Sequence, residues 1–350
     1  MRLLIAASGT GGHLFPAIAT AAELGDHHIE WLGVPDRLET QLVPQSYPLH
    51  TIAVEGFQTK LGLGSVRTLN RLTSSIFNVR RLLRQEKFDA IFTTGGYIAG
   101  PAILAARSLG VPVILHESNV LPGKVTRLLS RWCDVVALGF EATKSYLPVP
   151  NKTVVVGTPV RPDFLKPAQN LPFDIPEDAF VIVVVGGSQG AVAVNQLVRQ
   201  AAPDWFKAGI WVVHLTGTHD PDIDSLQHSQ YIALPFYDRM AALLNRANLA
   251  ISRAGSGTLT ELAVTQTPSI LIPYPYAAED HQTYNANVFT QADAALMMPQ
   301  KTLTSEALNQ TVFELFKNPD KLAAMKQATA SLAVRDSAKQ LADLITKRFA

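Results

Sequence analysis

Short apolar runs alternate with longer stretches of helical periodicity along most of the chain. The apolar runs span residues 3–7, 90–93, 113–116, 181–185, 211–215, 249–252 and 269–272. Helical patterns follow several of these runs, at residues 15–24, 101–109 and 191–201. Strands that alternate with helices at this spacing predict parallel sheets covered by helices on both faces. The fold class we expect is therefore α/β.

One proline-rich stretch near the middle of the chain interrupts this alternation. Its prolines are Pro159, Pro162, Pro167, Pro172 and Pro176. Proline at this density favours a linker over a regular element, and 350 residues are too many for one ordinary core. We predict two doubly wound domains, at residues 1–157 and 173–335, joined by a linker at 158–172. The last helical pattern, 319–349, ends in a segment, 336–350, that can return to pack on the first domain.

Composition narrows the class of protein. Hydrophobic residues make up 47% of the chain and charged residues 17%, which is typical of a globular protein. A net charge of +1 argues against bulk nucleic-acid binding. The single cysteine, Cys133, excludes an internal disulfide and a cysteine-based metal cluster and fits a reducing cytoplasm. The longest uncharged stretch, 91–106, is shorter than the roughly 20 residues of a transmembrane helix, so we expect none.

The first apolar run ends in the sequence SGTGGH, from Ser8 to His13, directly before a helical pattern. A backbone with so few side chains, between a strand and a helix, can bring its N–H groups against an anion. His13 is a candidate proton acceptor, because imidazole titrates near neutrality. The same arrangement opens the second half, where GGSQG follows the run at 181–185.

Two other interpretations of the first glycine turn remain open. It is not GxGxxG, and only Asp36 and Glu39 stand where a dinucleotide site needs an acidic residue, so NAD binding is weakly supported. A tight turn without any ligand is the second alternative.

Polar clusters also follow the strands predicted at 90–93 and 113–116. The first is TTGGY, from Thr93 to Tyr97, and the second is HESN, from His116 to Asn119. Because parallel strands end at the same edge of a sheet, we expect His13, Tyr97, Glu117 and Asn119 to converge. The alternative is that His116 and Glu117 only pair with each other or cap a helix near Lys124.

The second half carries a further glycine-rich turn, SRAGSGTLTE, from Ser252 to Glu261. It is suited to a diphosphate at a helix N-terminus, and Glu261 can accept two ribose hydroxyls. A helix start with a favourably placed acid is an equal alternative. The polar segment DHQTYN at 280–285 is expected to begin a helix. The acids at Asp220, Asp222 and Asp224 lack the pattern of a calcium loop, so we interpret them as a solvated loop.

Residues 57–87 are basic and apolar with almost no acids. They include Arg67, Arg71, Arg80, Arg81, Arg84 and Lys87, interleaved with Phe57, Leu61, Leu63, Leu69, Leu72, Ile76 and Phe77. Such a segment can rest on an anionic bilayer. An amphipathic helix with one face in the core and a basic solvent face is the alternative.

Seven of these motifs, in order and over nearly the whole chain, resemble those of the MurG family. They are SGTGGHLFPA, TTGGYIAGPAILAA, VPVILHESNVLPG, VGTPVRPDF, VVVGGSQGA, RAGSGTLTE and EDHQTYNA. The resemblance implies a GT-B fold of two Rossmann-like domains facing across a cleft. It also implies an enzyme that transfers N-acetylglucosamine from UDP-N-acetylglucosamine to undecaprenyl-diphosphate-linked N-acetylmuramoyl-pentapeptide (lipid I), giving lipid II in peptidoglycan synthesis.

The resemblance assigns roles to individual residues. Donor contacts would come from Thr10, Gly11, Gly12, Asn119, Arg161, Ser188, Gln189, Tyr237, Ser256, Gly257, Thr258, Leu259, Thr260, Glu261 and Gln282. Among these, Tyr237 would lie by the uracil, Glu261 would take the ribose hydroxyls and Gln282 would contact the sugar. Acceptor contacts would come from Gly9, Gly95, Gly96, Tyr97 and His116.

The chemistry that follows is a single displacement with inversion. We take His13 as the base for the acceptor C4 hydroxyl, since the positive end of a helix favours neutral imidazole, and Glu117 as the rival base. Arg161 and the helix that begins at Ser256 would stabilise the leaving diphosphate. We therefore expect no obligatory metal and no cofactor.

The resemblance also places the protein peripherally, on the cytoplasmic face of the inner membrane, through residues 57–87. Two alternative functions remain: a glycosyltransferase that uses UDP-sugar and diacylglycerol, and a non-catalytic nucleotide-sugar binding protein.

Overall fold

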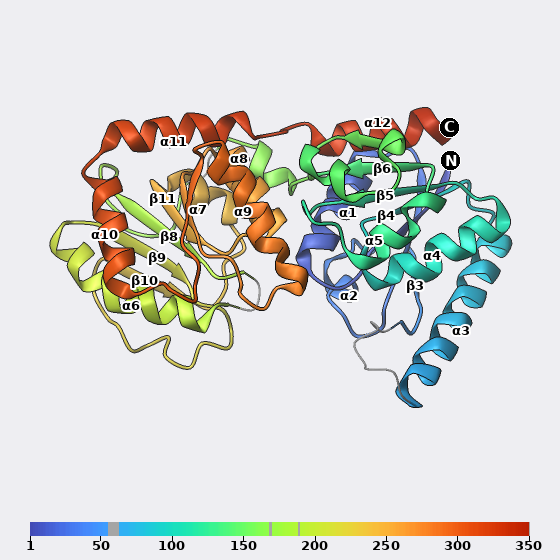
Figure 1. The fold of residues 1–350 in the computed structure, drawn as a ribbon, viewed down its shortest axis with the longest axis horizontal. Coiled ribbons are helices and arrows are strands. Elements are labelled where there is room, and N and C mark those ends of the chain that lie inside the picture. The colour runs from blue at the N-terminus through green and yellow to red at the C-terminus, as the bar shows by residue number, and fades with distance from the viewer. Residues whose placement is uncertain (55–62, 168–169, 188–189, 350) are drawn as a thin grey trace. The chain divides into compact units, whose positions relative to one another are not determined.

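The chain folds into two compact α/β units. The computed structural model describes residues 1–54, 63–167, 170–187 and 190–349, leaving aside the side chains of 63–69. One unit comprises Met1–Arg161 with Asp336–Ala350, and the other comprises Pro162–Arg335; Figure 1 shows the elements of each. The division between units lies inside the stretch expected to be a linker. That stretch is not free of regular structure, because Pro162–Leu165 form a short 3-10 helix (η4) in which Phe164 is buried.

The N-terminal unit is built on a seven-stranded sheet in the order β3-β2-β1-β4-β5-β6-β7, with every neighbouring pair parallel. Its strands are β1 (Arg2–Ala6), β2 (His28–Gly33), β3 (Leu49–Thr51), β4 (Ala90–Thr93), β5 (Val113–Glu117), β6 (Val135–Leu138) and β7 (Thr153–Val155). Its α-helices are α1 (Gly11–Glu23), α2 (Glu39–Leu42), α3 (Leu63–Glu86), α4 (Gly96–Leu109), α5 (Lys124–Leu129) and α12 (Ser337–Phe349). Short 3-10 helices are η1 (Ser130–Trp132), η2 (Glu141–Tyr146) and η3 (Pro150–Lys152).

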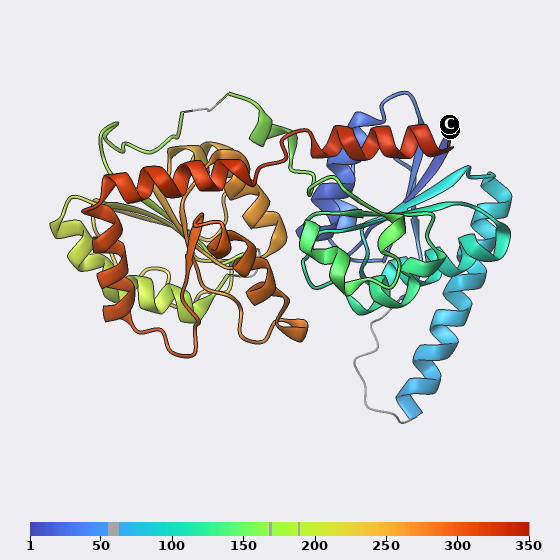
Figure 2. The same cartoon turned by 45° about the horizontal axis from the view of Figure 1, so that its top comes forward.

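The strand β1 is apolar from Leu3 to Ala6 because both of its faces are buried there. Leu3 and Ile5 pack on the side covered by α1 and α12, whereas Leu4 and Ala6 pack on the side covered by α3 and α4. In Figures 1 and 2, α12 lies along α1. Successive side chains of a strand point to opposite faces, so a strand covered twice reads as one continuous apolar run.

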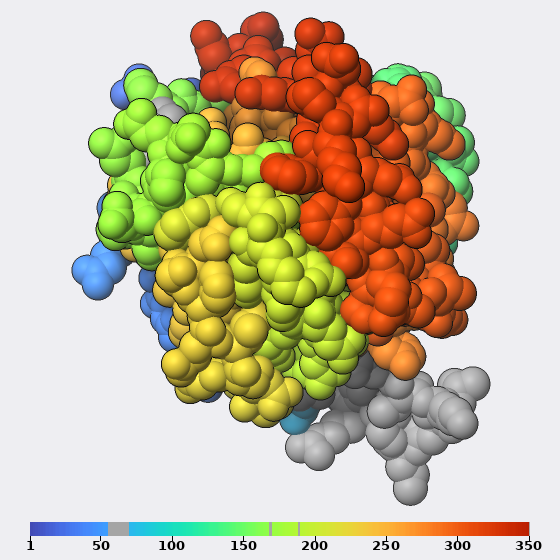
Figure 3. Space-filling view, turned by 90° about the vertical axis from the view of Figure 1, so that its left-hand side faces the viewer, coloured from blue at the N-terminus to red at the C-terminus, as the bar shows by residue number. Residues whose placement is uncertain are grey.

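The C-terminal unit repeats this plan with a six-stranded parallel sheet in the order β10-β9-β8-β11-β12-β13. Its strands are β8 (Val181–Val185), β9 (Trp211–Leu215), β10 (Tyr231–Leu234), β11 (Leu249–Ser252), β12 (Ser269–Leu271) and β13 (Ala295–Met297). Its remaining helices are α6 (Val192–Lys207), α7 (Met240–Arg246), α8 (Ser256–Thr265), η5 (Ala278–Asp280), α9 (His281–Gln291), α10 (Ser305–Phe316) and α11 (Pro319–Ser331). Helices α6 and α10 share one core cluster and form part of the surface in Figure 3.

The prediction of one last helix at 319–349 is wrong. The segment forms α11 and α12, which are separated by residues 332–336. Met325 and Thr329 of α11 are buried in the C-terminal unit, whereas Leu341 and Ile345 of α12 are buried in the N-terminal unit. The helix is interrupted because its two apolar stripes belong to different cores.

Helix α3 shows the core-packing face expected of an amphipathic helix. Ser75, Val79 and Leu83 are buried, while Phe77 is 64% exposed. The helix extends past the rest of its unit in Figures 1 and 2. Residues 57–62 of the basic segment lie outside the described residues. No helix in the described part of the chain is both long enough and apolar enough to cross a bilayer.

Glu30 on β2 is a buried carboxylate shared by three cationic or titratable partners. Its oxygens lie 2.7 Å from the Arg2 guanidinium, 2.8 Å from His28 Nε2 and 2.6 Å from His50 Nε2. Burial by itself would raise the pKa of Glu30, but hydrogen bonds from His50, His28 and Arg2 outweigh it and hold the pKa below 4.5.

A lowered folded-state pKa makes stability depend on pH at the acid end. The contribution is present above the unfolded pKa and is lost as the pH falls through the folded pKa. We therefore expect Glu30→Gln to destabilise the protein near neutrality, and the difference to shrink as the pH falls through the lowered pKa of Glu30. Urea unfolding at a series of pH values measures this. A difference that stays undiminished at the acid end would contradict the role of Glu30.

Candidate functional site

The first glycine turn lies at the topological switch point of the N-terminal sheet, between β1 and β4. Ligands bind at such points in open parallel sheets. His13 stands in the first turn of α1, and its Nδ1 lies 2.7 Å from the carbonyl oxygen of Thr94, just after β4. A carbonyl only accepts, so Nδ1 must carry the proton. In neutral imidazole the lone pair is then on Nε2.

Glycines leave the Nε2 edge of the His13 ring uncrowded. A Cβ on Gly96 would lie 3.5 Å from Nε2, and one on Gly95 would lie 3.8 Å from Cε1 and 4.0 Å from the carbonyl of His116. Gly95 and Gly96 have positive φ angles of 86° and 74°, which favour glycine. The structure thus brings the ends of β1, β4 and β5 together around His13. Tyr97 follows at the start of α4 and is 47% exposed.

The Glu39 carboxylate stabilises the first glycine turn by accepting hydrogen bonds. Its Oε1 accepts from the Ser8 hydroxyl at 2.6 Å and the Val34 N–H at 2.7 Å, and its Oε2 accepts from the Gly9 N–H at 3.3 Å. The carboxylate is fully buried. Glu39 is therefore engaged inside the protein, unlike the acid of a dinucleotide site, which accepts ribose hydroxyls.

Arg161 lies beside the same turn. Its guanidinium carbon is 4.7 Å from the centre of the Phe15 ring. A Cβ on Gly11 would come within 2.7 Å of that ring, so Gly11, Phe15 and Arg161 form one stack. Thr10 and Gly12 are exposed at the start of α1.

The HESN segment after β5 is held mainly by internal hydrogen bonds. His116 is fully buried, and its Nε2 donates to the Gly157 carbonyl at 2.9 Å. Glu117 Oε1 accepts from the backbone and side-chain N–H groups of Asn119 at 3.0 and 3.2 Å. Glu117 Oε2 accepts from Gly123, the residue before α5, at 3.1 Å. The capping alternative is thus present in the structure, through Gly123 and not through Lys124.

The second glycine turn follows β8, at the switch point between β8 and β11. Gly190 has φ +77°, and a Cβ there would lie 2.3 Å from the Thr216 carbonyl oxygen. Glycine is required by this close approach. Ser188 and Gln189 lie outside the described residues.

The third glycine-rich turn joins β11 to α8. Gly255 is the N-cap of α8 and has no side chain to cap it, so the N–H groups from Ser256 onward face the end of the sheet without a side-chain cap. Gln282, in the first turn of α9, accepts from the N–H groups of Ala254 at 3.2 Å and Tyr274 at 2.9 Å. Its oxygen is therefore fixed, and its amide N–H₂ is the end that can donate to a ligand. Glu261 lies in the second turn of α8 and is partly exposed.

A buried arginine adds positive charge beside this turn. The Arg253 guanidinium donates to the carbonyls of Ile272 and Pro273 at 3.0 and 3.3 Å and to Gln300 at 2.6 Å. These acceptors are neutral, and burial lowers the pKa of Arg253.

Tyr237 packs its ring against Phe173, with centroids 5.6 Å apart. Within the described ranges, no cluster of three or more His, Cys, Asp or Glu side chains could hold a metal ion.

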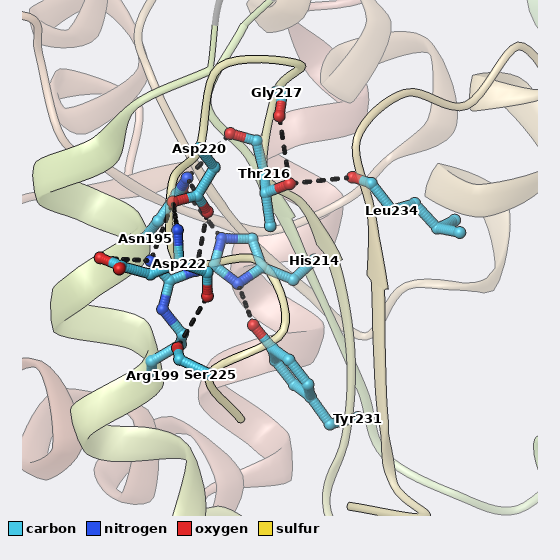
Figure 4. Close-up of polar contacts among 10 residues, drawn as sticks. All are labelled: Asn195, Arg199, His214, Thr216, Gly217, Asp220, Asp222, Ser225, Tyr231 and Leu234. Carbon is cyan, nitrogen blue, oxygen red and sulfur yellow. Dashed lines mark hydrogen bonds and ion pairs between the residues drawn. The ribbon is translucent and has the colours of Figure 1, made fainter. Parts of the chain in front are cut away.

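The prediction of a solvated loop at Asp220 is wrong. Its carboxylate is fully buried and pairs with Arg199 of α6 at 2.7 Å (Figure 4). Asp222, two residues on, has a side chain 48% exposed, so only the first acid departs from the prediction. The available signals were polar residues at 195 and 199, one helical turn apart on an apolar helix face, and a histidine inside the apolar strand WVVHL.

Comparison with known proteins identifies the family. Residues 3–138 match the glycosyltransferase family 28 N-terminal domain, and residues 181–341 match the C-terminal domain. The chain is 66% identical to a Gloeothece citriformis protein over 99% of this chain and 95% of that one. That relative is named UDP-N-acetylglucosamine–N-acetylmuramyl-(pentapeptide) pyrophosphoryl-undecaprenol N-acetylglucosamine transferase. The crystal structure of Acinetobacter baumannii MurG matches 99% of this chain and 100% of its own, with 30% identity and a TM-score of 0.79.

The chain belongs to the MurG family. A Nostoc relative bearing the same transferase name is 65% identical over 99% of this chain and 97% of its own length. The glycosyltransferase of kitacinnamycin, at 15% identity and a TM-score of 0.76 over 100% of this chain and 99% of its own, shares the fold alone. The two Rossmann-like sheets of this MurG-family chain confirm the predicted GT-B fold class.

Proposed function

We propose that this chain transfers N-acetylglucosamine from UDP-N-acetylglucosamine to the C4 hydroxyl of undecaprenyl-diphospho-N-acetylmuramoyl-pentapeptide. The observation that carries the proposal is the identity of 66%, over 99% of the chain, to a relative named for that transfer. The glycine turns at two switch points supply the two anion-binding environments that a diphosphate donor and a diphosphate acceptor need.

The N-terminal unit would hold the acceptor and the base. Nε2 of His13 carries the lone pair because Nδ1 donates to Thr94, so it can take the proton of the acceptor hydroxyl as that oxygen attacks the anomeric carbon. The acceptor diphosphate would lie on the turns that contain Gly9, Gly95 and Gly96, near Tyr97. Thr10, Gly11, Gly12 and Asn119 would meet the donor from this unit.

The C-terminal unit would hold the donor. The N–H groups of Ser256, Gly257 and Thr258 would face the diphosphate, since the Leu259 N–H already donates to the Gly255 carbonyl at 3.0 Å. The helix dipole of α8 would stabilise the charge that grows on departing UDP. Arg253 adds a buried positive charge, and Arg161 would supply another from the N-terminal unit. Glu261 would accept the ribose hydroxyls. Gln282 would donate to the sugar through its amide N–H₂.

Glu117 and His116 fit positioning roles better than direct contact. Both oxygens of Glu117 accept hydrogen bonds from the 119–123 loop, which orients Asn119. His116 is fully buried, so we place it behind the site.

One assay separates this proposal from its two alternatives. UDP release from UDP-N-acetylglucosamine is followed with lipid I and, separately, with diacylglycerol as acceptor. We expect release with lipid I only. Release with diacylglycerol would indicate a glycolipid synthase, and UDP-N-acetylglucosamine binding without release under either condition would indicate a binding protein.

We also propose that residues 57–87 contact an anionic membrane surface, which would place the enzyme on the cytoplasmic face of the inner membrane. The support is the exposed Phe77 beside the exposed Arg81 and Arg84 on α3. A helix with this surface binds lipid through charge and apolar burial together.

Vesicle binding tests the membrane surface. Phe77→Ser is expected to weaken sedimentation with anionic vesicles by about 3- to 10-fold, and added salt is expected to weaken it further. Tyr276→Ser is the matched control, because Tyr276 is 79% exposed in the other unit. Binding that responds neither to salt nor to Phe77→Ser would contradict this surface.

A further inference from the structure

A buried polar network connects α6 with β9 and the loop after it, behind the second glycine turn (Figure 4). Arg199 forms a bidentate ion pair with Asp220, in which one guanidinium nitrogen lies 2.7 Å from Oδ2 and the other lies 3.1 Å from Oδ1. Asn195 Nδ2 donates to Asp220 Oδ2 at 2.9 Å and to the Thr216 carbonyl at 2.8 Å. His214 links Asn195 to Tyr231. In Figure 3 the segment after β9, in yellow, lies at the surface beside α6, yet the Asp220 carboxylate is wholly buried.

The network has one internally consistent arrangement of hydrogen atoms. The two acceptors of Asn195 Nδ2 are a carbonyl and a carboxylate, so the amide cannot be flipped, and its oxygen faces His214 Nε2 at 3.0 Å. Nε2 must then carry the proton, and Nδ1 accepts from the Tyr231 hydroxyl at 2.8 Å. Burial and the Arg199 charge lower the pKa of His214 to about 3, which keeps the ring neutral in this role.

The network reaches the glycine turn through one backbone carbonyl. The Thr216 carbonyl that Asn195 holds is the atom that lies against Gly190, where even a Cβ would approach it to 2.3 Å. At the other end of the loop, Asp220 pairs with Arg199. The Asp222 N–H also donates a hydrogen bond to Asp220 Oδ1 at 3.3 Å. Residues 216–222 therefore form a hydrogen-bonded support that Gly190 packs against.

We propose that the Arg199–Asp220 ion pair is a positioning element for Gly190, the last residue of the second glycine turn, which would contact the nucleotide-sugar, and so sets donor affinity without touching the donor. The inference rests on the proposed function only for the identity of the ligand. A buried ion pair is a weak source of net stability, and apolar replacements are often neutral or better. The bidentate geometry of the pair does fix the orientation of the two side chains. A support for a tight turn needs such a fixed orientation.

The test uses the full chain and a variant that leaves no buried charge, Arg199→Met with Asp220→Asn. The control is Asp204→Ala with Lys207→Ala, an exposed pair at 2.7 Å near the end of the same helix. Three quantities are measured: the unfolding temperature, the Kd for UDP and the amide hydrogen exchange of peptides covering 183–192 and 249–262. The KM values for donor and acceptor are recorded separately.

We expect the charge-free variant to fold and to bind UDP about tenfold more weakly, which corresponds to about 1.4 kcal/mol of binding free energy. Its amide hydrogens should exchange faster in peptides covering 183–192 but not in those covering 249–262. The acceptor KM and the control pair should be unaffected, and Arg199→Lys should recover part of the donor affinity. A folded variant with wild-type UDP affinity and wild-type exchange would overturn the proposal.

Failure of the proposed function gives a different result. If the wild-type chain does not bind UDP, the donor assignment is wrong, while the exchange at 183–192 still decides the positioning role. If the double variant does not fold, Arg199→Lys alone, which keeps a positive charge opposite Asp220 but loses the bidentate geometry, is judged by the same two criteria.

Discussion

Replacing His13 with alanine is expected to lower turnover by about 10²- to 10⁴-fold, the range that a positioned general base contributes. UDP affinity is expected to stay within about twofold. The reason is geometric: Nδ1 is held by the Thr94 carbonyl at 2.7 Å, so Nε2 is the proton acceptor, and Gly95 and Gly96 leave its edge uncrowded. Single-turnover rates with lipid I, together with UDP binding measured by calorimetry, test this.

A comparison of Glu117→Ala with His13→Ala separates the general base from a residue that only positions the loop. Because Glu117 accepts hydrogen bonds from Asn119 and Gly123, its loss should disturb the 119–123 loop and raise KM together with a fall in kcat. His13→Ala should lower kcat alone. Near-normal turnover in His13→Ala would exclude His13 as the base and return the role to Glu117.

Glu39→Ala is expected to reduce the free energy of unfolding by about 2–4 kcal/mol, because three donors would lose a buried acceptor. Those donors are the Ser8 hydroxyl and the backbone N–H groups of Val34 and Gly9. Since Gly9 belongs to the first glycine turn, turnover should fall as well. Thermal and urea unfolding, followed by far-ultraviolet circular dichroism, measure the loss.

Asp36→Asn serves as the control, since Asp36 is exposed in the same loop after β2 and asparagine tolerates its φ of 58°; it should change stability by less than about 0.5 kcal/mol. The experiment also addresses the dinucleotide alternative. If Glu39→Ala were as stable as wild type but had lost binding of NAD, the carboxylate would be a ligand contact and not a structural acceptor.

The sequence alone predicted the fold class and most central strands for a clear reason. Strands β1, β4, β5, β8, β9 and β11 are covered on both faces, so each reads as a mainly apolar run, with His214 of β9 as an internal polar residue. The strands β3, β7 and β13 have three residues each and lie at sheet edges. Runs that short do not stand out from loops in the sequence, and they were not predicted.

The glycine turns and His13 were also predictable, because their positions follow from strand ends and from turns that only glycine accommodates. The roles of the acidic residues were not. Glu39, Glu117 and Asp220 all lie at or near strand ends and look alike in sequence. Glu39 and Asp220 are buried against donors from other elements of their units, whereas Glu117 is buried against donors from the loop that follows it. A carboxylate is exposed or buried according to whether the fold delivers those donors.

The sequence by itself thus determined the two parallel α/β units, the glycine turns at their switch points and, through its ordered motifs, the family. Those features depend on local backbone preferences and on apolar periodicity, which are written in neighbouring residues. Only the tertiary structure decided which nitrogen of His13 holds the lone pair, that Glu117 and Glu39 act as internal acceptors, and that Asp220 is buried in an ion pair with Arg199. The His13 contact with Thr94 spans 81 positions and the Arg199–Asp220 ion pair spans 21, and such pairings exist only once the sheets have formed.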